Sequence, residues 1–447
     1  MKNRKTVLLF ALSFMAVAMT APICLGQSTT QKWSQLRGAN GTGVASENAK
    51  PAVQIDLDNQ TVWELDIPGT GWSTPVYDGE LIWLTTAITV KATKNEIAKK
   101  LAGDPMAQIK TLAKSVELRA IAISKSDGKL IHDVLLTTVA QPEPINPMNS
   151  YASPTPAIAD GRVICHFGSY GTWCLDAKTG DKIWDTKYVI NHSVGPGSSP
   201  VVFDGRVILV CDGMDQQYIA AVELASGKEI WKTSRPPIAA TNGEYRKAYS
   251  TPINITVDGK QQLVIPGAQW AAAYAPENGK EIWRLDHGKG FSVTPMAIYD
   301  SGLIVFATGY MRPQFVAVDP TGTGDVSKTH LKWRTRGAPT MPSFVVNDGK
   351  IYSISDDGIL ICVDVKTGKE LNKKRVGGNY SSSPLLAGGN LYISSREGQM
   401  KVVKCSPELE TITTNQFKSS IMASPISVSY THLRAHETRA FISYAVF

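Results

Sequence analysis

The sequence predicts an all-β fold, an eight-bladed β-propeller of four-stranded antiparallel blades. Three observations lead to this prediction: a Ser/Thr-rich step that ends in proline and recurs along the chain, a hairpin pattern after each step, and a second hairpin pattern after the first. The steps end at Pro75, Pro156, Pro200, Pro252, Pro295, Pro342, Pro384 and Pro425. After the first interval, the spacings lie between 41 and 52 residues, which is the period of propeller blades.

The first hairpin is predicted by Asp-Gly pairs that stand between two runs of β-branched and apolar residues. Residues 201–209, Val-Val-Phe-Asp-Gly-Arg-Val-Ile-Leu, are one copy, and residues 157–164 are another. Asp-Gly at such a place favours a two-residue turn, because both turn positions need a positive φ. Each repeat therefore begins with two antiparallel strands.

The second hairpin is clearest in residues 174–184, Cys-Leu-Asp-Ala-Lys-Thr-Gly-Asp-Lys-Ile-Trp. Apolar residues flank a turn that closes on glycine, so two further strands complete a four-stranded blade. One column of this hairpin holds only small residues, which we attribute to close approach of neighbouring sheets. These residues are Ala122, Cys174, Ala221, Ala273, Ala317 and Cys362.

Another column of the second hairpin holds tryptophan. Its members are Trp184, Trp231, Trp283 and Trp333, and Trp63 has the same setting. Trp63 precedes the first proline step, so its strand belongs to no complete repeat. We expect this N-terminal strand to close the ring by completing the last blade, because closure removes the exposed edges of an open sheet.

The pattern Ala/Cys-x-Asp-x-x-Thr-Gly-x-x-x-Trp resembles the tryptophan-docking repeat of the pyrroloquinoline-quinone (PQQ)-like β-propeller family. That family includes PQQ-dependent dehydrogenases and non-enzymatic relatives such as the barrel-assembly scaffold lipoprotein of the outer membrane. Residues 33–38, Trp-Ser-Gln-Leu-Arg-Gly, resemble the opening of many exported members. The resemblance covers roughly residues 33–425 and implies that the recurring tryptophans, with Trp63, dock neighbouring blades. It says less about activity, because one fold hosts many functions.

The domain organisation follows from the two ends of the chain. Residues 1–26 are typical of a cleaved signal peptide, with a basic start and an apolar run at 7–20, which predicts a periplasmic or secreted protein. We expect an N-terminal strap at 27–60 and the propeller at 61–426, with a helical insertion at about 90–116 in blade 1. Residues 427–447 resemble translated sequencing-adapter sequence, so we expect a non-native tail and an incomplete eighth blade.

Charge and cysteine content exclude two classes of protein. The net charge of +7 falls to +4 without Lys2, Arg4 and Lys5 of the signal peptide, which is too weak to indicate a nucleic-acid partner. The cysteines beyond the signal peptide are scattered and odd in number, so we expect free, buried thiols rather than a disulfide framework. They are Cys165, Cys174, Cys211, Cys362 and Cys405.

One set of residues is a candidate binding site. An aromatic residue precedes five of the proline steps, where the innermost strands begin near the ring axis, so these residues are expected at one mouth of the channel. They are Trp72, Tyr151, Tyr249, Phe291 and Tyr380. They could stack on a planar or sugar-like ligand, or they could plug the channel and pack against a neighbouring blade. Arg246, Arg312 and Arg396 could add an anion site.

The sequence assigns no catalytic residue and no metal ligand. It has no vicinal Cys-Cys pair, no Gly-x-Ser-x-Gly elbow and no phosphate-binding loop, and its histidines are scattered. We therefore expect an exported, non-catalytic binding or scaffold module of the cell envelope, without a cofactor, whose ligand is an envelope protein or a small molecule. Two alternatives remain: a PQQ-dependent dehydrogenase with a degenerate site, which would need PQQ and Ca²⁺, and a propeller that senses a sugar or another small molecule.

Overall fold

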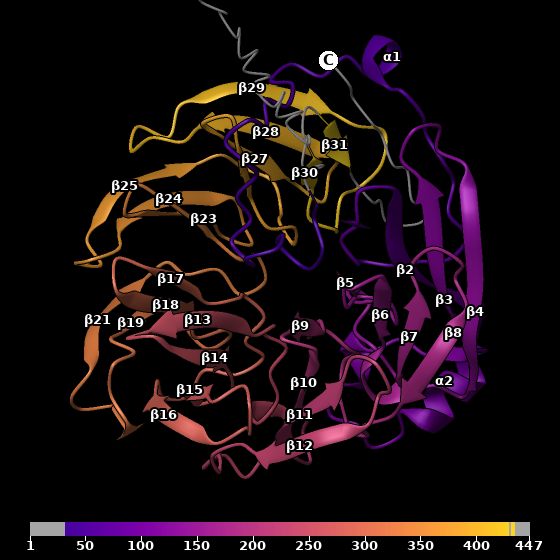
Figure 1. Cartoon of the computed structure of the whole chain (residues 1–447), viewed down its shortest axis with the longest axis horizontal. Coiled ribbons are helices and arrows are strands. Elements are labelled where there is room, and N and C mark those ends of the chain that lie inside the picture. Colours follow the sequence, from indigo (N-terminus) through magenta and orange to yellow (C-terminus); the bar gives the residue numbers. More distant parts are fainter. Residues whose placement is uncertain (1–31, 429–430, 434–447) are drawn as a thin grey trace, which may run out of the picture. The chain divides into compact units, whose positions relative to one another are not determined.

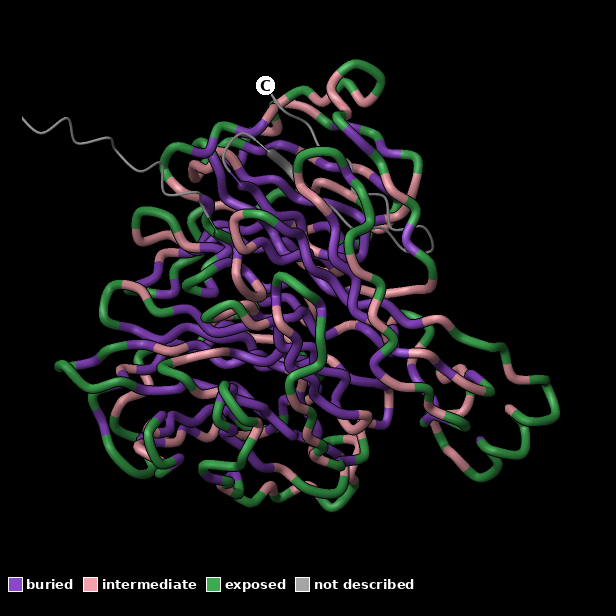
Figure 2. Tube along the Cα trace, turned by 45° about the vertical axis from the view of Figure 1, so that its right-hand side comes forward, coloured by how far each residue is buried: buried purple, intermediate pink, exposed green. Residues whose placement is uncertain are grey.

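The structure is a computed structural model that describes residues 32–428 and 431–433. The expected signal peptide at 1–26 and most of the expected non-native tail lie outside the described residues. The described chain is a β-propeller, as the repeats predict, and its antiparallel sheets follow one another in sequence order (Figure 1). The two middle strands of each complete blade are mostly buried, whereas the outermost strands and many of the loops are exposed (Figure 2).

The first four blades share one order, with the innermost strand first and the outermost last. Blade 1 contains β1 Val76–Tyr77, β2 Leu81–Lys91, β3 Ala113–Ser124 and β4 Leu130–Ala140. Blade 2 contains β5 Ala157–Ala159, β6 Arg162–His166, β7 Thr172–Asp176 and β8 Lys182–Thr186. Blade 3 contains β9 Val201–Phe203, β10 Arg206–Asp212, β11 Gln217–Glu223 and β12 Glu229–Ser234. Blade 4 contains β13 Ile253–Val257, β14 Lys260–Pro266, β15 Trp270–Tyr274 and β16 Glu281–Asp286.

The remaining blades repeat this order, with one additional strand. Blade 5 contains β17 Ile298–Asp300, β18 Leu303–Ala307, β19 Gln314–Val318 and β21 Leu331–Arg336, while β20 Gly324–Asp325 joins β16 of blade 4 in parallel. Blade 6 contains β22 Val345–Asn347, β23 Lys350–Ile354, β24 Ile359–Asp364 and β25 Glu370–Arg375. Blade 7 contains β26 Leu385–Ala387, β27 Asn390–Ser394, β28 Gln399–Lys404 and β29 Thr411–Gln416. Of blade 8, the described residues include β30 Ile426–Val428 and β31 Thr431–Leu433.

The few helical segments lie outside the blades' sheets. Helix α1 is Leu57–Gln60 in the strap, and α2 is Lys94–Lys100 in the long β2–β3 connection, where Thr93 and Glu96 form a capping box. The rest of the insertion expected to be helical contains a single 3₁₀ turn at Ala107–Ile109, and Thr111 then forms a β-bridge with Ile145. Further 3₁₀ turns are Gly168–Tyr170 and Gly243–Tyr245.

The tryptophan column connects each blade to the next one. The indole Nε1 of Trp184, Trp231 and Trp333 donates a hydrogen bond to a backbone oxygen in the turn of the following blade, at 2.9–3.0 Å. Where the column lacks tryptophan, His132 contacts the Lys178 oxygen of blade 2 and Asn372 donates to the Pro407 oxygen of blade 7.

Trp283 is arranged differently from the other members of the column. Its Nε1 donates to Gln262 Oε1 within blade 4, and Gln262 Nε2 in turn donates to the Pro320 oxygen of blade 5. The additional strand β20 occupies this blade interface, so the glutamine extends the reach of the indole.

The column of small residues lies directly opposite the tryptophan column. We call the latter the docking column, because it also includes His132 and Asn372. Ala221 pairs with Trp231, Cys174 pairs with Trp184, and Cys362 pairs with Asn372. A β-bulge follows the small residue in each of these strands. The small side chain therefore leaves room for the large one across the ladder, which explains the column more directly than sheet approach alone. Cys165, Cys174, Cys211, Cys362 and Cys405 are free thiols, and all but Cys405 are buried.

The proline steps form a belt of hydrogen bonds around the ring axis. A backbone N–H near the proline of one blade donates to a Ser or Thr hydroxyl near the proline of the next. The pairs are Thr74–Thr155, Thr155–Ser199, Ser199–Thr251, Met296–Ser343, Ser343–Ser383 and Ser383–Ser424, at 2.9–3.0 Å. Because the proline steps are largely buried, each of these hydroxyls accepts a hydrogen bond from a backbone N–H that water does not reach.

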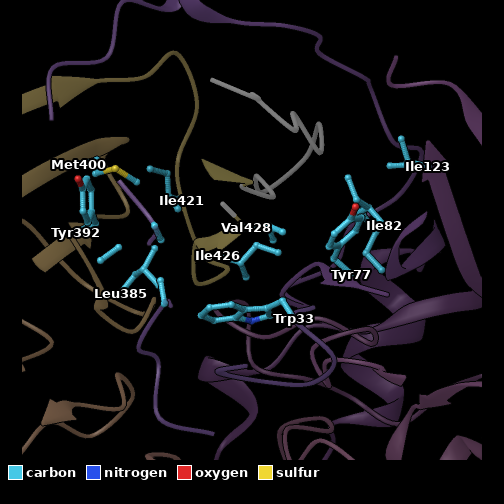
Figure 3. Packing of buried hydrophobic residues seen from close by; sticks show 14 of the residues in the cluster. Trp33, Tyr77, Ile82, Ile123, Leu385, Tyr392, Met400, Ile421, Ile426 and Val428 are labelled. Carbon is cyan, nitrogen blue, oxygen red and sulfur yellow. The ribbon is translucent and has the colours of Figure 1, made fainter. Parts of the chain in front are cut away.

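The strap connects the two ends of the described ring. Trp33 exchanges backbone hydrogen bonds with Tyr77 of blade 1, and Val44 bridges Leu386 of blade 7. Figure 3 shows Trp33 beside Ile426 of blade 8, within one buried cluster that also includes residues of blades 1 and 7. The strap thus covers the place where the chain's beginning and end meet.

The strap also extends to blade 6. The guanidinium of Arg37 donates to the backbone oxygens of Phe344 and Pro384 at 2.8 Å, and burial lowers its pKa to about 9. Trp63, which follows the strap, donates to the Lys125 oxygen of blade 1 at 2.9 Å, in the way that Trp184, Trp231 and Trp333 bond to a neighbouring blade. Residues 62–67 have no assigned strand, so Trp63 takes the docking position without a regular ladder around it.

Candidate functional site

The five predicted channel-mouth aromatics fall into two groups. Tyr151 and Tyr380 are 2% and 0% exposed, and their hydroxyls donate to the backbone oxygens of Glu143 and Gly377 at 2.9 Å. Burial raises the pKa of each to about 12. These two side chains pack inside the structure and present no surface to a ligand. They therefore fit the second of the two roles considered from the sequence, which was packing against a neighbouring blade.

Trp72, Tyr249 and Phe291 are partly exposed. Trp72 Nε1 donates to the Met148 oxygen at 3.2 Å, and the Tyr249 hydroxyl donates to the His192 oxygen at 2.8 Å. We call the end of the blades that carries the proline steps the proline rim. Phe291 differs from the other two because it belongs to a larger group of exposed side chains on this rim.

The aromatic cluster consists of Tyr245, Phe291, Tyr310 and Met311. The Tyr245 and Phe291 rings meet edge to face with centroids 4.9 Å apart, and the Phe291 and Tyr310 rings are 6.1 Å apart. Tyr245, Tyr310 and Met311 are 46%, 42% and 64% exposed. Large side chains of these types are enriched in protein–protein interfaces.

Backbone hydrogen bonds hold the loops of the aromatic cluster together. Ser292 N donates to the Lys247 oxygen, Tyr249 N to the Val293 oxygen, and Tyr310 N to the Phe291 oxygen, at 2.8–3.0 Å. Ser292 also has a positive φ of 49°. The cluster is therefore carried by three connected loops rather than by one isolated tip.

The three arginines considered for an anion site lie in two different places on the proline rim. Arg246 and Arg312 lie beside the aromatic cluster, next in sequence to Tyr245 and Met311. Arg396 lies elsewhere on the proline rim, where its Nη1 is 2.9 Å from the sulfur of Met148. The structure therefore brings two of the three together with Phe291, and places the third with Trp72 through Met148.

A buried charged group lies beneath this part of the rim. Lys110 of the insertion contacts Asp104 at 2.8 Å and Glu244 at 3.9 Å, and Glu244 also pairs with Lys247. Burial acts to raise the pKa of Glu244, but hydrogen bonds from Lys247 and Ser193 outweigh it and hold that pKa below its usual value. These ion pairs fasten the insertion of blade 1 to the loop that carries Tyr245.

Ser193 and Lys247 meet as a nucleophile and a base would. Lys247 Nζ is 2.9 Å from Ser193 Oγ, and Ser193 has a positive φ of 65°. However, Ser193 Oγ donates to Glu244 at 2.7 Å, and Lys247 shares the same carboxylate. Both side chains are buried, so the serine proton is already committed, no substrate can reach the hydroxyl, and the arrangement is structural.

A second buried ion pair lies within blade 3 and contacts blade 4. Arg235 contacts Asp212 at 2.6 Å, both side chains are almost fully buried, and Arg235 also donates to the Ile265 oxygen of blade 4 at 2.8 Å. Burial raises the pKa of Asp212 to about 6, and the charge of Arg235 offsets that rise only in part. Burial likewise lowers the pKa of His287 and of His192 to about 4, so both rings are neutral near pH 7.

Two hollows are lined by residues outside the aromatic cluster. One, of about 260 Å³, is lined by residues 40–42 of the strap together with β13 and residues 297–299. The other, of about 900 Å³, lies between blades 1 and 2, where its lining includes Tyr77, Lys125 and Ile131. Neither brings together the residues singled out from the sequence.

Comparison with known proteins identifies the family. The sequence model of a family described as outer membrane protein assembly factor BamB matches residues 26–254 and 267–406. The chain belongs to the BamB family.

Two curated BamB proteins show how distant the relationship is. BamB of Legionella pneumophila (strain Paris) is 22% identical over 215 residues, 47% of this chain, and that match spans about half, 51%, of the relative's length. BamB of Moranella endobia (strain PCIT) is 22% identical over 383 residues, which is 83% of this chain and 89% of the relative.

The chain shares its fold with solved structures of both a BamB protein and an enzyme. BamB from Moraxella catarrhalis superposes with a TM-score of 0.54 at 13% identity, over 76% of this chain and all of that one. A europium-containing methanol dehydrogenase superposes with a TM-score of 0.63 at 12% identity, over 91% of this chain and 88% of that one. Identities this low show the fold alone.

A Ca²⁺-dependent quinone site requires a group of oxygen ligands for the metal. Calcium takes roughly six to eight of them, mostly from carboxylates and carbonyls. Among residues 32–428 and 431–433, no group of three or more His, Cys, Asp or Glu side chains is placed to hold a metal ion. In the same described part of the chain, no helix is both long and apolar enough to span a membrane.

Sequence reasoning missed Tyr245, Tyr310 and Met311. They lie outside the proline-step pattern, in loops that do not repeat between blades. One signal was available: residues 309–313, Gly-Tyr-Met-Arg-Pro, stand where blade 6 has Asp-Asp-Gly at 356–358. A polar turn replaced by apolar residues indicates a loop with a task beyond turning the chain.

Proposed function

We propose that this chain is an exported, non-catalytic scaffold of the cell envelope that binds another protein during outer-membrane protein assembly. The observation that carries the proposal is the family match, which covers most of the chain and bears the description of an outer membrane protein assembly factor. The expected signal peptide at 1–26 supports export.

The site supports a binding role over a catalytic one. The Ser193–Lys247 pair is buried and engaged by Glu244, and the exposed chemistry of the proline rim is aromatic and cationic. Burial of Tyr151 and Tyr380 leaves a small, flat ligand fewer of the stacking surfaces that the sequence suggested. A rigid ring that displays loops is suited to hold a partner in a fixed place.

Deletion of the gene in the source organism tests this function. We expect smaller amounts of β-barrel proteins in the outer-membrane fraction and a more permeable outer membrane, with recovery when the full chain is supplied. A chain that lacks residues 1–26 should not restore them, because it would not be exported. Unchanged amounts and unchanged permeability in the deletion strain would refute the proposal.

A further inference from the structure

The aromatic cluster is a raised surface and not an enclosed pocket. Tyr245, Tyr310 and Met311 each keep about half of their surface exposed. Sites for small molecules instead bury most of the ligand in a concave pocket. An exposed group of large aromatic and thioether side chains is suited to the side chains of another protein.

Positive side chains outnumber negative ones in the loops of the cluster. Residues 243–249, 288–293 and 309–313 contain Arg246, Lys247, Lys289 and Arg312 against one carboxylate, Glu244, which is engaged by Lys247 and Ser193. Lys247 is buried in its ion pair with Glu244, whereas Lys289 and Arg312 are exposed. The nearby carboxylate of Asp286 already accepts hydrogen bonds from Gln269 and from the Gly288 N–H. The surface is therefore complementary to acidic groups.

The tip of the cluster adopts a conformation that side chains seldom take. Met311 and Arg312 are consecutive non-glycine residues with positive φ of 71° and 68°, a backbone region that residues with a side chain rarely occupy. Such backbone strain concentrates at binding sites and switch regions. Here it directs an apolar and a cationic side chain outward from one turn, beside Tyr310.

Four other exposed apolar residues follow the blade repeat and do not form such a group. Ile183, Ile230, Leu371 and Ile412 each precede a docking-column position on an outer strand of a different blade. They are single residues that repeat with the blade, as soluble proteins commonly show. The aromatic cluster is distinct from them because its three rings contact one another in sequence, Tyr245 with Phe291 and Phe291 with Tyr310, and its members belong to three loops.

We propose that the aromatic cluster, with Lys289 and Arg312, docks an acidic segment of a partner protein that carries aromatic or large aliphatic side chains. The apolar side chains of that segment would pack on Tyr245, Tyr310 and Met311, and its carboxylates would pair with Lys289 and Arg312. This inference rests on the proposed scaffold function, because it names the surface through which the scaffold holds its partner.

Binding of a labelled synthetic peptide tests the inference. The probe alternates Asp and Glu with Phe and Leu, and a second probe replaces the acids with Lys. We expect the full chain to bind the acidic probe more tightly, with an affinity that falls as salt screens the charges. The double variant Tyr310→Ser/Met311→Ser should bind at least roughly tenfold more weakly, as loss of central interface residues does, and Arg312→Glu should also weaken binding.

Matched controls separate the site from general stickiness. Ile412→Ser removes an apolar side chain of similar exposure from β29, and Lys373→Glu reverses an exposed charge on β25. Both should bind the acidic probe as the unaltered chain does, and all variants should keep its melting temperature. Equal binding of both probes, or equal loss in the controls, would overturn the inference. So would binding of anionic phospholipid vesicles at this cluster in place of the peptide, since that would indicate a membrane surface.

Complementation distinguishes this inference from the proposed function. Suppose that the deletion strain shows the assembly defect and that the Tyr310→Ser/Met311→Ser variant restores normal assembly. The cluster is then not the docking surface, and the scaffold function stands. If the deletion strain shows no defect, the proposed function fails, whatever the peptide binds.

Discussion

Ring closure depends on a contact between Trp63 and the turn of blade 1, and this contact can be tested by crowding it. Gly128 in that turn has a φ of +71°, and a Cβ placed there would lie 2.5 Å from the indole of Trp63. Gly259, in a turn of blade 4, has nearly the same φ of +73°, but a Cβ there would meet nothing within 4 Å. Gly259→Ala therefore reports the backbone penalty alone.

The two glycines predict different losses of stability. The left-handed backbone costs an alanine about 1–2 kcal/mol at either position. Gly128→Ala adds the cost of forcing a methyl group against the indole, about 1–3 kcal/mol for overpacking. Trp63 is buried, so Trp63→Ala should cost about 3–5 kcal/mol. In the Trp63→Ala background the steric part disappears, and Gly128→Ala should then cost only what Gly259→Ala costs.

The assay is equilibrium unfolding in urea, followed by circular dichroism, for the single and double variants. We expect a coupling between Trp63 and Gly128 of about 1–3 kcal/mol, within the range for residues in contact. Trp63 and Gly259 should show additive effects. Equal costs for the two glycine variants, or additivity of Trp63→Ala with Gly128→Ala, would refute the assignment of Trp63 as the residue that closes the ring.

Three further predictions concern buried polar groups. The pKa of Asp212 is about 6 in the folded chain against 3.8 for the ordinary group, so the folded state binds the extra proton and Asp212 adds stability as pH falls from 7 towards 4. The melting temperature of the unaltered chain relative to Asp212→Asn should rise over that interval, and a constant difference would contradict the shift. Arg37→Met leaves the oxygens of Phe344 and Pro384 without the guanidinium donor. The Leu386 N–H donates to the Gly43 oxygen of the strap, so its hydrogen exchange should accelerate in this variant. Unchanged exchange would mean that Arg37 does not hold the strap. Thr155→Val removes the acceptor of the Thr74 N–H and should cost about 1–3 kcal/mol, whereas Thr155→Ser should cost little; equal costs in urea unfolding would remove the hydroxyl belt from the account.

The repeats predicted the blades because each blade is a local unit with its own turns. Asp160 and Gly161, for example, have φ of 47° and 71°, as the Asp-Gly hairpin requires. The docking column was harder to complete from sequence. Asn372 and Gln262 make the same kind of bond between blades as an indole does, but polar residues at these positions carry no aromatic signature.

The proline rim was predictable only in part, because the exposure of its side chains depends on how the loops fold over one another. Tyr151 and Tyr249 both precede a proline step, by five and three residues, yet the first is buried and the second is partly exposed. The hydroxyl of Tyr151 bonds to its own loop at Glu143, whereas that of Tyr249 reaches His192 in the loop of the preceding blade. The assembly of Tyr245, Phe291 and Tyr310 depends on contacts between blades, which spacing along the chain does not encode.

The measurement that tests the scaffold function most directly is the rate at which a newly made β-barrel protein reaches its folded, protease-resistant form in the outer membrane. In a pulse-chase experiment, we predict a slower rate in the deletion strain at an unchanged rate of synthesis. The full chain and the Ile412→Ser control should restore the rate. The same assembly rate with and without the protein would contradict the account.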